Sequence, residues 1–406
     1  MSEAPAARGY GAAVVGAGII GLACAWRIAQ TGGSVLVIDR AEPGAGASGV
    51  AAGMLAPVTE ADFGEEALLR LNLEGAAAWP AFAAELAERT GVDLGYEERG
   101  ALVVAVDRDD AEELHRLHEL QCSLGLDAAW LSARECRRLE PGLSPRVRGG
   151  VHAPHDHQVD PRAVLRALRE AVEQAGGELL TGAEVESVAE TEGSVRGVAT
   201  SLGFVAADHV VLAGGVWSPG LRIPTGGPSL PVRPVKGQLL RLRGPASAML
   251  AERLIRTPRC YVVCRRNGEV VVGATVEERG FDTTVTAGAV HQLLDDAREA
   301  LPDIDERELV EASAGLRPGT PDNCPIVGAA EPAGVVWATG HYRNGVLLAP
   351  LTAAAAADVV VRSGLSANGR GVAVAIDGEV VPRGEWSGTE LYAGQRLELL
   401  QAVQGG

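Results

Sequence analysis

The sequence predicts an α/β protein, with a Rossmann-like dinucleotide-binding domain, an inserted α+β domain that contains an antiparallel sheet, and a short β-rich C-terminal tail. Three observations lead to this prediction. A glycine-rich turn joins a buried strand to a helix near the N-terminus, short alternating strands fill residues 230–276, and a hairpin pattern follows residue 370. A chain of 406 residues has room for about two or three domains.

The first domain begins with a β-α-β unit. Residues 11–15 have an apolar strand pattern, residues 18–30 a helical one, and residues 34–38 form a second strand that ends at Asp39. Further apolar strands are predicted over residues 101–106, 209–213 and 335–339. Helical spacing predicts helices over residues 65–89, 109–124, 160–176 and 349–361. Alternating residues predict the antiparallel strands of the inserted domain over residues 237–243, 261–265 and 269–274.

Composition and charge exclude several classes of partner. Apolar residues make up 47% and charged residues 22% of the chain, the balance of a soluble globular protein. The net charge of −17 repels nucleic-acid phosphates and anionic lipid headgroups, so we expect neither nucleic acid nor a membrane as a partner. The 6 cysteines form no CxxC pair, so we expect free thiols in a reducing, cytoplasmic compartment.

The glycine-rich turn has the spacing of a phosphate-binding loop. Gly16, Gly18 and Gly21 surround Ile19 and Ile20 in the pattern GxGxxG. The first glycine makes the tight turn, the second lets a pyrophosphate approach the backbone, and the third lets the helix pack on the sheet. Asp39 follows at the tip of the second strand, where a carboxylate accepts hydrogen bonds from an adenosine ribose.

Two further loops favour FAD over NAD. Residues 44–54 form a second run of small residues directly after Asp39, where they could line the pyrophosphate and the flavin. Residues 339–345 (TGHYRNG) precede the last predicted helix, and a helix N-terminus aimed at the flavin would stabilise its anionic reduced form.

Several separated motifs resemble the D-amino-acid oxidase family of flavoproteins, and within it the glycine oxidases of thiamin biosynthesis. The resemblance covers roughly residues 11–361. The matching segments, in chain order, are residues 15–22 (VGAGIIGL), 51–54 (AAGM), 211–218 (VLAGGVWS), 234–238 (PVKGQ), 260–263 (CYVV), 272–275 (VGAT), 314–320 (AGLRPGT) and 340–345 (GHYRNG). Many motifs in the right order are more specific than one glycine fingerprint.

The resemblance implies a domain division and a set of residues that bind FAD without a covalent bond. An FAD-binding domain would comprise residues 1–75, 150–222 and 312–366, a substrate-binding domain residues 76–149 and 223–311, and a tail residues 367–406. The implied cofactor-binding residues are Gly16, Gly18, Ile19, Ile20, Gly21, Asp39, Arg40, Ser48, Ala52, Gly53, Met54, Val185, Gly214, Trp217, Arg343, Asn344, Gly345, Val346 and Leu347.

The resemblance also implies the reaction. The family oxidises the Cα–N bond of small amino acids by hydride transfer to flavin N5, and molecular oxygen then reoxidises the flavin to give hydrogen peroxide. Arg317 matches the arginine that binds the substrate carboxylate, and Tyr261 matches the tyrosine that donates to the same group. Arg343 matches a second position near flavin and substrate. A small amino acid and oxygen are thus the expected partners, and we also expect a homo-oligomer.

Two other features invite a different interpretation. His152, His155, His157 and Asp160 lie in one stretch, but the implied chemistry needs no metal, and Asp160 precedes Pro161 as the N-cap of a predicted helix. Cys324 follows a Thr-Pro-Asp sequence instead of preceding it as in relatives that tether flavin, so we expect a free thiol.

The tail has a separate resemblance. Residues 371–386 have a hairpin pattern with an Asp377-Gly378 turn, residues 397–403 a strand pattern, and the chain ends in Gly405-Gly406. This is similar to the C-terminal half of the thiamin sulfur-carrier family, a β-grasp fold whose first hairpin and helix have little room before residue 371. Enzymes that activate such carriers or form thiazole would be further partners.

Three readings remain open from the sequence. The leading one is an FAD-dependent glycine oxidase of thiamin biosynthesis. The second is another member of the family, such as a D-amino-acid or sarcosine oxidase, or a dehydrogenase that passes electrons to a quinone. The third is a carrier or interaction protein with a degenerate flavin domain, against which the intact glycines, Asp39 and Arg317 argue.

Overall fold

The computed structural model describes residues 9–224, 229–368, 372–376, 379–381 and 397–401. Its first sheet is built on the predicted β-α-β unit, in which β1 (Tyr10–Val15) leads through α1 (Ile19–Gln30) to β2 (Val35–Asp39). On either side of β1 lie β2 and β11 (Gly203–Leu212), both parallel to it. Outward from these follow β8 (Glu178–Thr181) on one side, and β18 (Val335–Thr339) with β17 (Ile326–Ala330) on the other.

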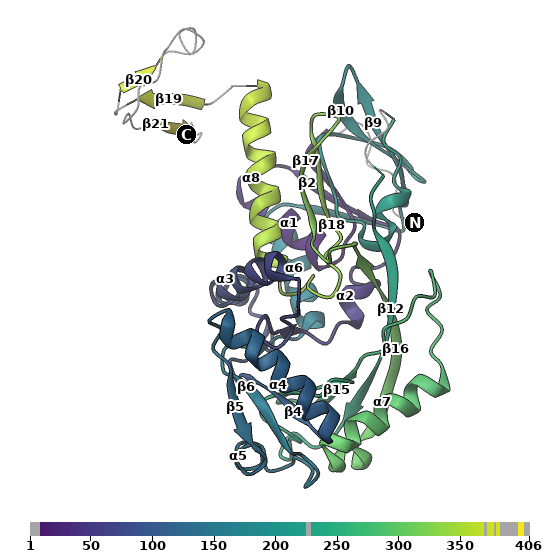
Figure 1. Ribbon diagram of the computed structural model, residues 1–406. Helices are drawn as coiled ribbons and strands as arrows, with labels where there is room; N and C mark the ends of the chain where they lie inside the picture. Colours follow the sequence, from purple (N-terminus) through teal and green to yellow (C-terminus); the bar gives the residue numbers. More distant parts are fainter. Residues whose placement is uncertain (1–8, 225–228, 369–371, 377–378, 382–396, 402–406) are drawn as a thin grey trace.

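Four helices cover one face of this sheet: α1, α3 (Glu66–Thr90), α6 (Pro161–Gln174) and α8 (Ala349–Asn368). In Figure 1 α8 stands beside α1 over the sheet. The alanines of α8 explain this close packing, because Ala349, Ala353 and Ala356 are fully buried. The opposite face is covered by β9 (Val185–Thr191) and β10 (Ser194–Thr200), which form an antiparallel extension of β11.

The second sheet is antiparallel for most of its width and lies in the lower half of Figure 1. Its central strands are those predicted between residues 237 and 274, now seen as β12 (Arg233–Arg243), β14 (Tyr261–Cys264) and β15 (Glu269–Gly273). It also recruits strands from before and after that region, namely β4 (Ala101–Ala105), β5 (Ala129–Ser132), β6 (Gly149–Ala153), β13 (Leu254–Arg256) and β16 (Glu308–Gly319). The predicted strand over residues 101–106 therefore belongs to this sheet.

The remaining elements connect or cover the two sheets. They are α2 (Ala47–Val50), β3 (Met54–Leu55), α4 (Arg108–Ser123), α5 (Ala133–Leu139), β7 (His157–Gln158), η1 (Gly215–Gly220), α7 (Ala287–Ala300) and η2 (Pro302–Glu306). As predicted, Asp160 caps α6, because its side chain accepts a hydrogen bond from the N–H of Arg162. In the described residues no helix is both long and apolar enough to cross a bilayer.

The tail contains three described strands. The first two, β19 (Val372–Ile376) and β20 (Glu379–Val381), pair antiparallel, as the hairpin pattern predicted, and β21 (Leu397–Gln401) pairs with the other edge of β19. The predicted turn at Asp377-Gly378 and the terminal Gly405-Gly406 lie outside the described residues. The last long helix runs to Asn368, seven residues beyond the predicted end at residue 361.

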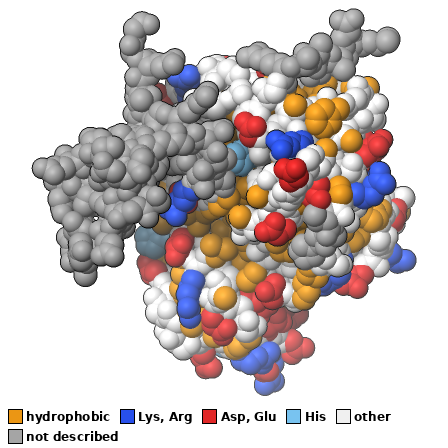
Figure 2. Space-filling model, turned by 90° about the horizontal axis from the view of Figure 1, so that it is seen from above, with side chains coloured by type: hydrophobic (Ala, Val, Ile, Leu, Met, Phe, Trp, Pro, Cys, Tyr) orange, Lys and Arg blue, Asp and Glu red, His pale blue; other side chains and the backbone are white. Residues whose placement is uncertain are grey.

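Charged residues of both signs cover the outside of the molecule. Figure 2 shows acidic and basic side chains interspersed with apolar ones over the described part of one face. A hollow lies between the two sheets, where the loops after β1, β11 and β18 meet the inner strands of the second sheet.

Candidate functional site

A cavity of about 1130 Å³ occupies this hollow. One end is lined by the glycine-rich turn and residues 44–54, and the other by β12, β14, β16 and residues 339–347. All of the residues predicted to bind cofactor or substrate line it, with the exception of Gly21. The structure therefore brings together segments that are more than 300 residues apart in the chain.

Gly21 lies behind the cavity wall for a steric reason. A Cβ atom at Gly21 would lie 1.9 Å from the carbonyl oxygen of Gly16, so this glycine permits the close packing of α1 on the turn. Gly16 itself has a φ of 105°, a conformation that favours glycine. The two residues shape the turn, and Gly18 presents its bare backbone to the cavity.

The start of α1 has no side-chain cap of its own. Gly18 is the N-cap residue, and the N–H of Ile19 donates to Ser48 Oγ at 3.0 Å. Asp39 accepts from two backbone N–H groups, those of Ala17 at 2.7 Å and Ala41 at 2.8 Å. The carboxylate predicted to face a ribose thus also fastens the phosphate loop to the end of β2, and it retains further acceptor sites toward the cavity.

Three arginines hold the wall between the two ends of the cavity. Arg241 donates to the carbonyl of Ala51 at 3.1 Å, Arg265 to that of Ala52 at 2.7 Å, and Arg162 to that of Gly49 at 2.8 Å. Glu269 pairs with Arg241 and Arg265, and Glu311 binds Arg162 through both oxygens. Burial lowers the pKa of the Arg265 guanidinium, and Glu269 opposes that effect. Residues 49–52 therefore have a fixed backbone where they line the cavity.

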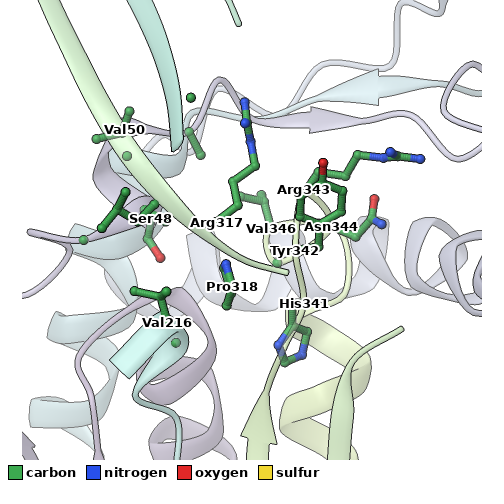
Figure 3. Close-up of a pocket in the computed structure, with 18 of the residues that line it drawn as sticks. Ser48, Val50, Val216, Arg317, Pro318, His341, Tyr342, Arg343, Asn344 and Val346 are labelled. Atoms are coloured by element: carbon green, nitrogen blue, oxygen red, sulfur yellow. The ribbon is translucent and has the colours of Figure 1, made fainter. Parts of the chain in front are cut away.

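Arg317 projects from β16 into the cavity without a carboxylate partner among the described residues (Figure 3). Its guanidinium donates to the carbonyl oxygen of Thr275 at 3.1 Å and approaches that of Lys236 at 3.5 Å. It lies flat against the neighbouring strand, because a Cβ atom on Gly237 would lie 2.3 Å from its Nη2. A guanidinium with only carbonyl acceptors is a ready binding site for an anion.

Tyr261, at the start of β14, lines the same cavity as Arg317. Its hydroxyl occupies space left by a glycine on the paired strand, since a Cβ atom on Gly273 would lie 2.3 Å from the phenol oxygen. Burial raises the pKa of this phenol, Arg317 lowers it and Glu60 raises it. The hydroxyl therefore keeps its proton and can donate to the anion that Arg317 binds.

Arg343, expected at a second position near flavin and substrate, lines the cavity and is paired with carboxylates. Its Nε lies 2.8 Å from Glu60 Oε2, and its Nη2 lies 2.9 Å from Glu65 Oε2. Glu60 also pairs with Arg256, at 2.8 Å between Oε1 and Nη1. Although burial favours the neutral acid, Arg256, Arg343 and Arg317 together hold the pKa of Glu60 below its usual value. Arg343 thus has carboxylate partners, whereas Arg317 has none among the described residues.

His341 is the remaining titratable group in the last loop. It is buried, and its Nε2 lies 2.8 Å from Thr352 Oγ1 at the start of α8. Burial lowers its pKa to about 3, so the ring is neutral at physiological pH. In Figure 3 its ring lies on the opposite side of the loop from Arg317 and Arg343. His341 therefore serves to join the loop to α8.

The donor set fits a bound flavin dinucleotide. Asn344 Nδ2 is buried at the cavity wall and has no hydrogen-bond partner within the described part of the chain. The backbone at Gly18 is open to the cavity, and α1 points its N-terminus at it. An unsatisfied amide at one end and a phosphate-binding turn at the other are the complements that an elongated dinucleotide requires.

Together, the dinucleotide turn and the nearby anion site define a nucleotide-dependent oxidoreductase that binds a small acid. The family model described as "FAD dependent oxidoreductase" matches residues 12–359. The chain belongs to this family, and FAD is its cofactor. The ThiS family model matches residues 348–406. The two matches overlap within α8, so the carrier-like match begins well before residue 371 and includes a helix.

The chain is similar to named proteins of the same family. It is 36% identical to glycine oxidase from Geobacillus kaustophilus over 87% of this chain and 93% of that one. The crystal structure of that enzyme superposes with a TM-score of 0.82, over 87% of this chain and 95% of that one. A crystal structure of iminodiacetate oxidase from Chelativorans sp., 27% identical, superposes with a TM-score of 0.75, covering 86% of this chain and 95% of that one.

One relative is a longer protein. The chain is 37% identical to a bifunctional protein ThiO/ThiG from Trichormus variabilis over 86% of this chain but 52% of the relative. The chain thus spans about half the length of that relative.

Sequence reasoning missed four residues at the substrate end. Gly237 and Gly273 lie inside the quoted motifs, and a glycine within a strand is a signal for close approach of another group. Glu60 and Arg256 lie outside every motif, and only the fold brings them to the cavity. In the stretch that contains His152, His155 and His157, His155 lies 3.1 Å from the exposed Asp127, and Asp160 caps α6 as predicted.

Proposed function

We propose that this protein oxidises glycine at its Cα–N bond, giving the imine and then glyoxylate and ammonia. The single observation that carries the proposal is Arg317, a guanidinium without a carboxylate partner among the described residues, in the cavity that Tyr261 also lines. These two groups fit one carboxylate. The similarity to two glycine oxidases at 36% and 32% identity supports glycine as the amino acid.

The protein's own contribution is to bind and orient the substrate. Arg317 and Tyr261 would bind the carboxylate from the second sheet, and so fix the direction of the Cα–H bond. Bound FAD supplies the two-electron acceptor. Neither His341, whose lowered pKa makes it a weak base, nor the paired guanidinium of Arg343 is suited to remove a proton from the substrate ammonium. We infer that the substrate amine reacts in its neutral form after losing a proton to solvent.

The cofactor would lie along the cavity. The residues of the glycine-rich turn, with Asp39 and Ser48, would hold the adenosine diphosphate, and Asn344 would donate to the flavin. We keep the domain division proposed from the sequence, with residues 76–149 and 223–311 as the substrate-binding domain. The second sheet, which carries Tyr261 and Arg317, supports a separate substrate-binding unit, although its strands β6 and β16 continue past the proposed boundaries at residues 149 and 311.

A role in thiamin biosynthesis follows from two similarities. The tail matches the ThiS family, and the relatives include bifunctional ThiO/ThiG proteins. We propose that enzymes that activate sulfur carriers or form thiazole are partners of this chain, that molecular oxygen is the electron acceptor, and that the protein assembles as a homo-oligomer.

A peroxide assay tests the proposed activity. The purified yellow protein is incubated with glycine, sarcosine, D-alanine and D-proline under oxygen, and kcat/KM is measured for each. We expect turnover of glycine, with a fall of about 30- to 1,000-fold in Arg317→Ala, because a buried charged contact is worth about 2–4 kcal/mol. Tyr261→Phe should cost less, since it removes one neutral donor. No peroxide with any amine, or an unchanged Arg317→Ala, would overturn the proposal.

A further inference from the structure

At the substrate end of the cavity, three guanidinium groups lie near two carboxylates. Two guanidinium groups, those of Arg256 and Arg343, are matched by two carboxylates, those of Glu60 and Glu65. Arg317 is the third guanidinium, and it has no carboxylate partner among the described residues. Among these five side chains one positive charge is unmatched and can pair with one substrate carboxylate, while Asp62, which also lines the cavity, acts on Arg343 without an ion-pair contact.

Glu60 is central to this balance, because it contacts both paired arginines. Its Oε1 lies 2.8 Å from Arg256 Nη1 and its Oε2 lies 2.8 Å from Arg343 Nε, and its side chain is only 10% exposed. Arg256, Arg317, Arg343 and Glu60 all line the same cavity. A second carboxylate on a substrate would have to displace Glu60 from these arginines or lie beside it unpaired.

The surrounding structure keeps Glu60 in place. Asp156 accepts hydrogen bonds from the N–H groups of Val58 at 3.0 Å and Thr59 at 2.7 Å. Gln121 donates to the carbonyl of Val58 at 2.9 Å, and Arg256 donates to that of Thr59 at 2.6 Å. The backbone before Glu60 is thus held by three side chains from separate segments, and the carboxylate itself is held by its ion pairs with Arg256 and Arg343.

We propose that Glu60 determines substrate specificity, by neutralising Arg256 and Arg343 so that the site accepts amino acids with one carboxylate and rejects those with two. The proposal deepens the proposed amine oxidation and rests on it. Its physical basis is repulsion between Glu60 and a second carboxylate, together with the pairing of Arg256 and Arg343 by Glu60.

Sarcosine and iminodiacetate form a matched pair of substrates for the test. Both are N-substituted glycines, and they differ in a methyl group against a carboxymethyl group on nitrogen. In Glu60→Gln, both Arg256 and Arg343 lose their ion pair with Glu60, and Arg343 keeps the one with Glu65. We expect the ratio of kcat/KM for iminodiacetate to that for sarcosine to rise about tenfold or more, because charged hydrogen bonds replace a repulsion.

Two further variants separate the local effect from a general change of charge. Glu60→Gln combined with Arg256→Gln restores the balance, so the ratio should return to within about threefold of the wild-type value. Glu112→Gln makes the same change in net charge on the exposed face of α4, where Glu112 pairs with Arg108, and should leave the ratio unchanged. The proposal would be overturned if the ratio of kcat/KM for iminodiacetate to that for sarcosine stayed raised in the double variant, or if it rose in Glu112→Gln.

A binding measurement makes the test independent of turnover. Acetate and malonate, with one and two carboxylates, are titrated against the FAD-loaded proteins and followed by the visible flavin spectrum. Glu60→Gln should bind malonate about tenfold more tightly than the wild type does, and acetate about equally. If this variant fails to fold, Arg256→Gln alone should weaken malonate binding several-fold more than acetate binding, since it leaves the negative charge of Glu60 less neutralised. Unchanged affinities in folded variants would refute the role of Glu60. A wild type that turns over no amine but shows these binding shifts would refute only the proposed reaction.

Discussion

At the scale of the residue, two glycines decide where the substrate-binding side chains lie. Gly237 gives the guanidinium of Arg317 room to lie against β12, and Gly273 does the same for the phenol of Tyr261 on β15. Neither glycine has a positive φ. Glycine is therefore needed at both positions because it lacks a side chain, and not because of an unusual backbone conformation. The positions of Arg317 and Tyr261 therefore depend on two glycines that have no functional side chain of their own.

Replacement of Gly237 by alanine tests this interpretation. The added Cβ would lie within 2.5 Å of the Arg317 guanidinium nitrogens and carbon. Because these atoms end a flexible side chain, the fold can absorb the change while the guanidinium moves. We expect kcat/KM for glycine to fall at least about tenfold and the melting temperature to change by only about 2 °C or less. Gly288→Ala, at a position with no neighbour within 4 Å, is the matched control. Equal kinetics in the two variants would contradict the interpretation.

Asp156 gives a prediction for the dependence of stability on pH. Burial raises the pKa of this carboxyl to about 6 from 3.8, although the N–H groups of Val58 and Thr59 lower it. Since the folded state holds the proton more tightly than the unfolded state, the stabilising contribution is complete below about pH 4 and is lost as the pH rises through about 6.

The free energy of unfolding should therefore fall between about pH 4 and pH 6 by roughly 2–3 kcal/mol from this group. Urea unfolding of wild type and Asp156→Asn at several pH values isolates the contribution, because the asparagine does not titrate and other groups cancel in the difference. The difference between the two proteins should change with pH over this window and stay constant above about pH 7. A difference that does not depend on pH would show that Asp156 has an ordinary pKa.

At the scale of the element, the short α2 and the residues after it depend on side chains of the second sheet. Arg241 in β12 is only 2% exposed and donates to the carbonyl of Ala51, while Glu269 in β15 fixes its other side. This contact couples the cofactor end of the cavity to the sheet that carries Arg317. Flavin retention should therefore respond to a residue that does not line the cavity.

Arg241→Met should destabilise the fold by about 2 kcal/mol or more and weaken FAD binding. The variant leaves Glu269 with Arg265 as its remaining partner and frees the carbonyl of Ala51. Arg243→Met, exposed near the end of the same strand, is the matched control. Thermal unfolding and the ratio of flavin to protein absorbance measure both effects. A variant that kept full flavin occupancy and its melting temperature would show that the arginine contact is dispensable.

The elements also show how far the sequence could predict this molecule. Gly16, Gly18 and Asp39 lie in one local pattern, so the phosphate turn could be placed without a structure. Arg317 and Tyr261 could be placed by motif. Glu60 and Arg256 could not, because their ion pair joins segments 196 residues apart and each looks like a surface charge in its own segment. The long β16 was also missed, since its glycines, serine and proline give no apolar strand pattern.

At the scale of the whole molecule, α8 links two families. The oxidoreductase match ends at residue 359 and the ThiS match begins at residue 348, so one helix is shared by both. The buried residues of its first half, Ala353, Ala356 and Val360, belong to the core formed with α1 and β1. The carrier-like region therefore shares a helix with the oxidase instead of following it as a separate unit.

A stop codon after Asn368 tests whether the oxidase needs any residue beyond α8. The truncated chain keeps every α8 residue that belongs to the oxidase core, so we expect FAD content and kcat/KM for glycine within about twofold of the full chain. A stop after Thr352 should instead abolish flavin binding, because it removes the buried Ala353, Ala356 and Val360 and leaves α1 without its neighbour. Flavin absorbance after gel filtration and peroxide kinetics report the outcome. If the chain that stops after Asn368 also lost its flavin, residues after 368 would have to stabilise the oxidase core. The tail would then be part of the folded enzyme and not only joined to it by the chain.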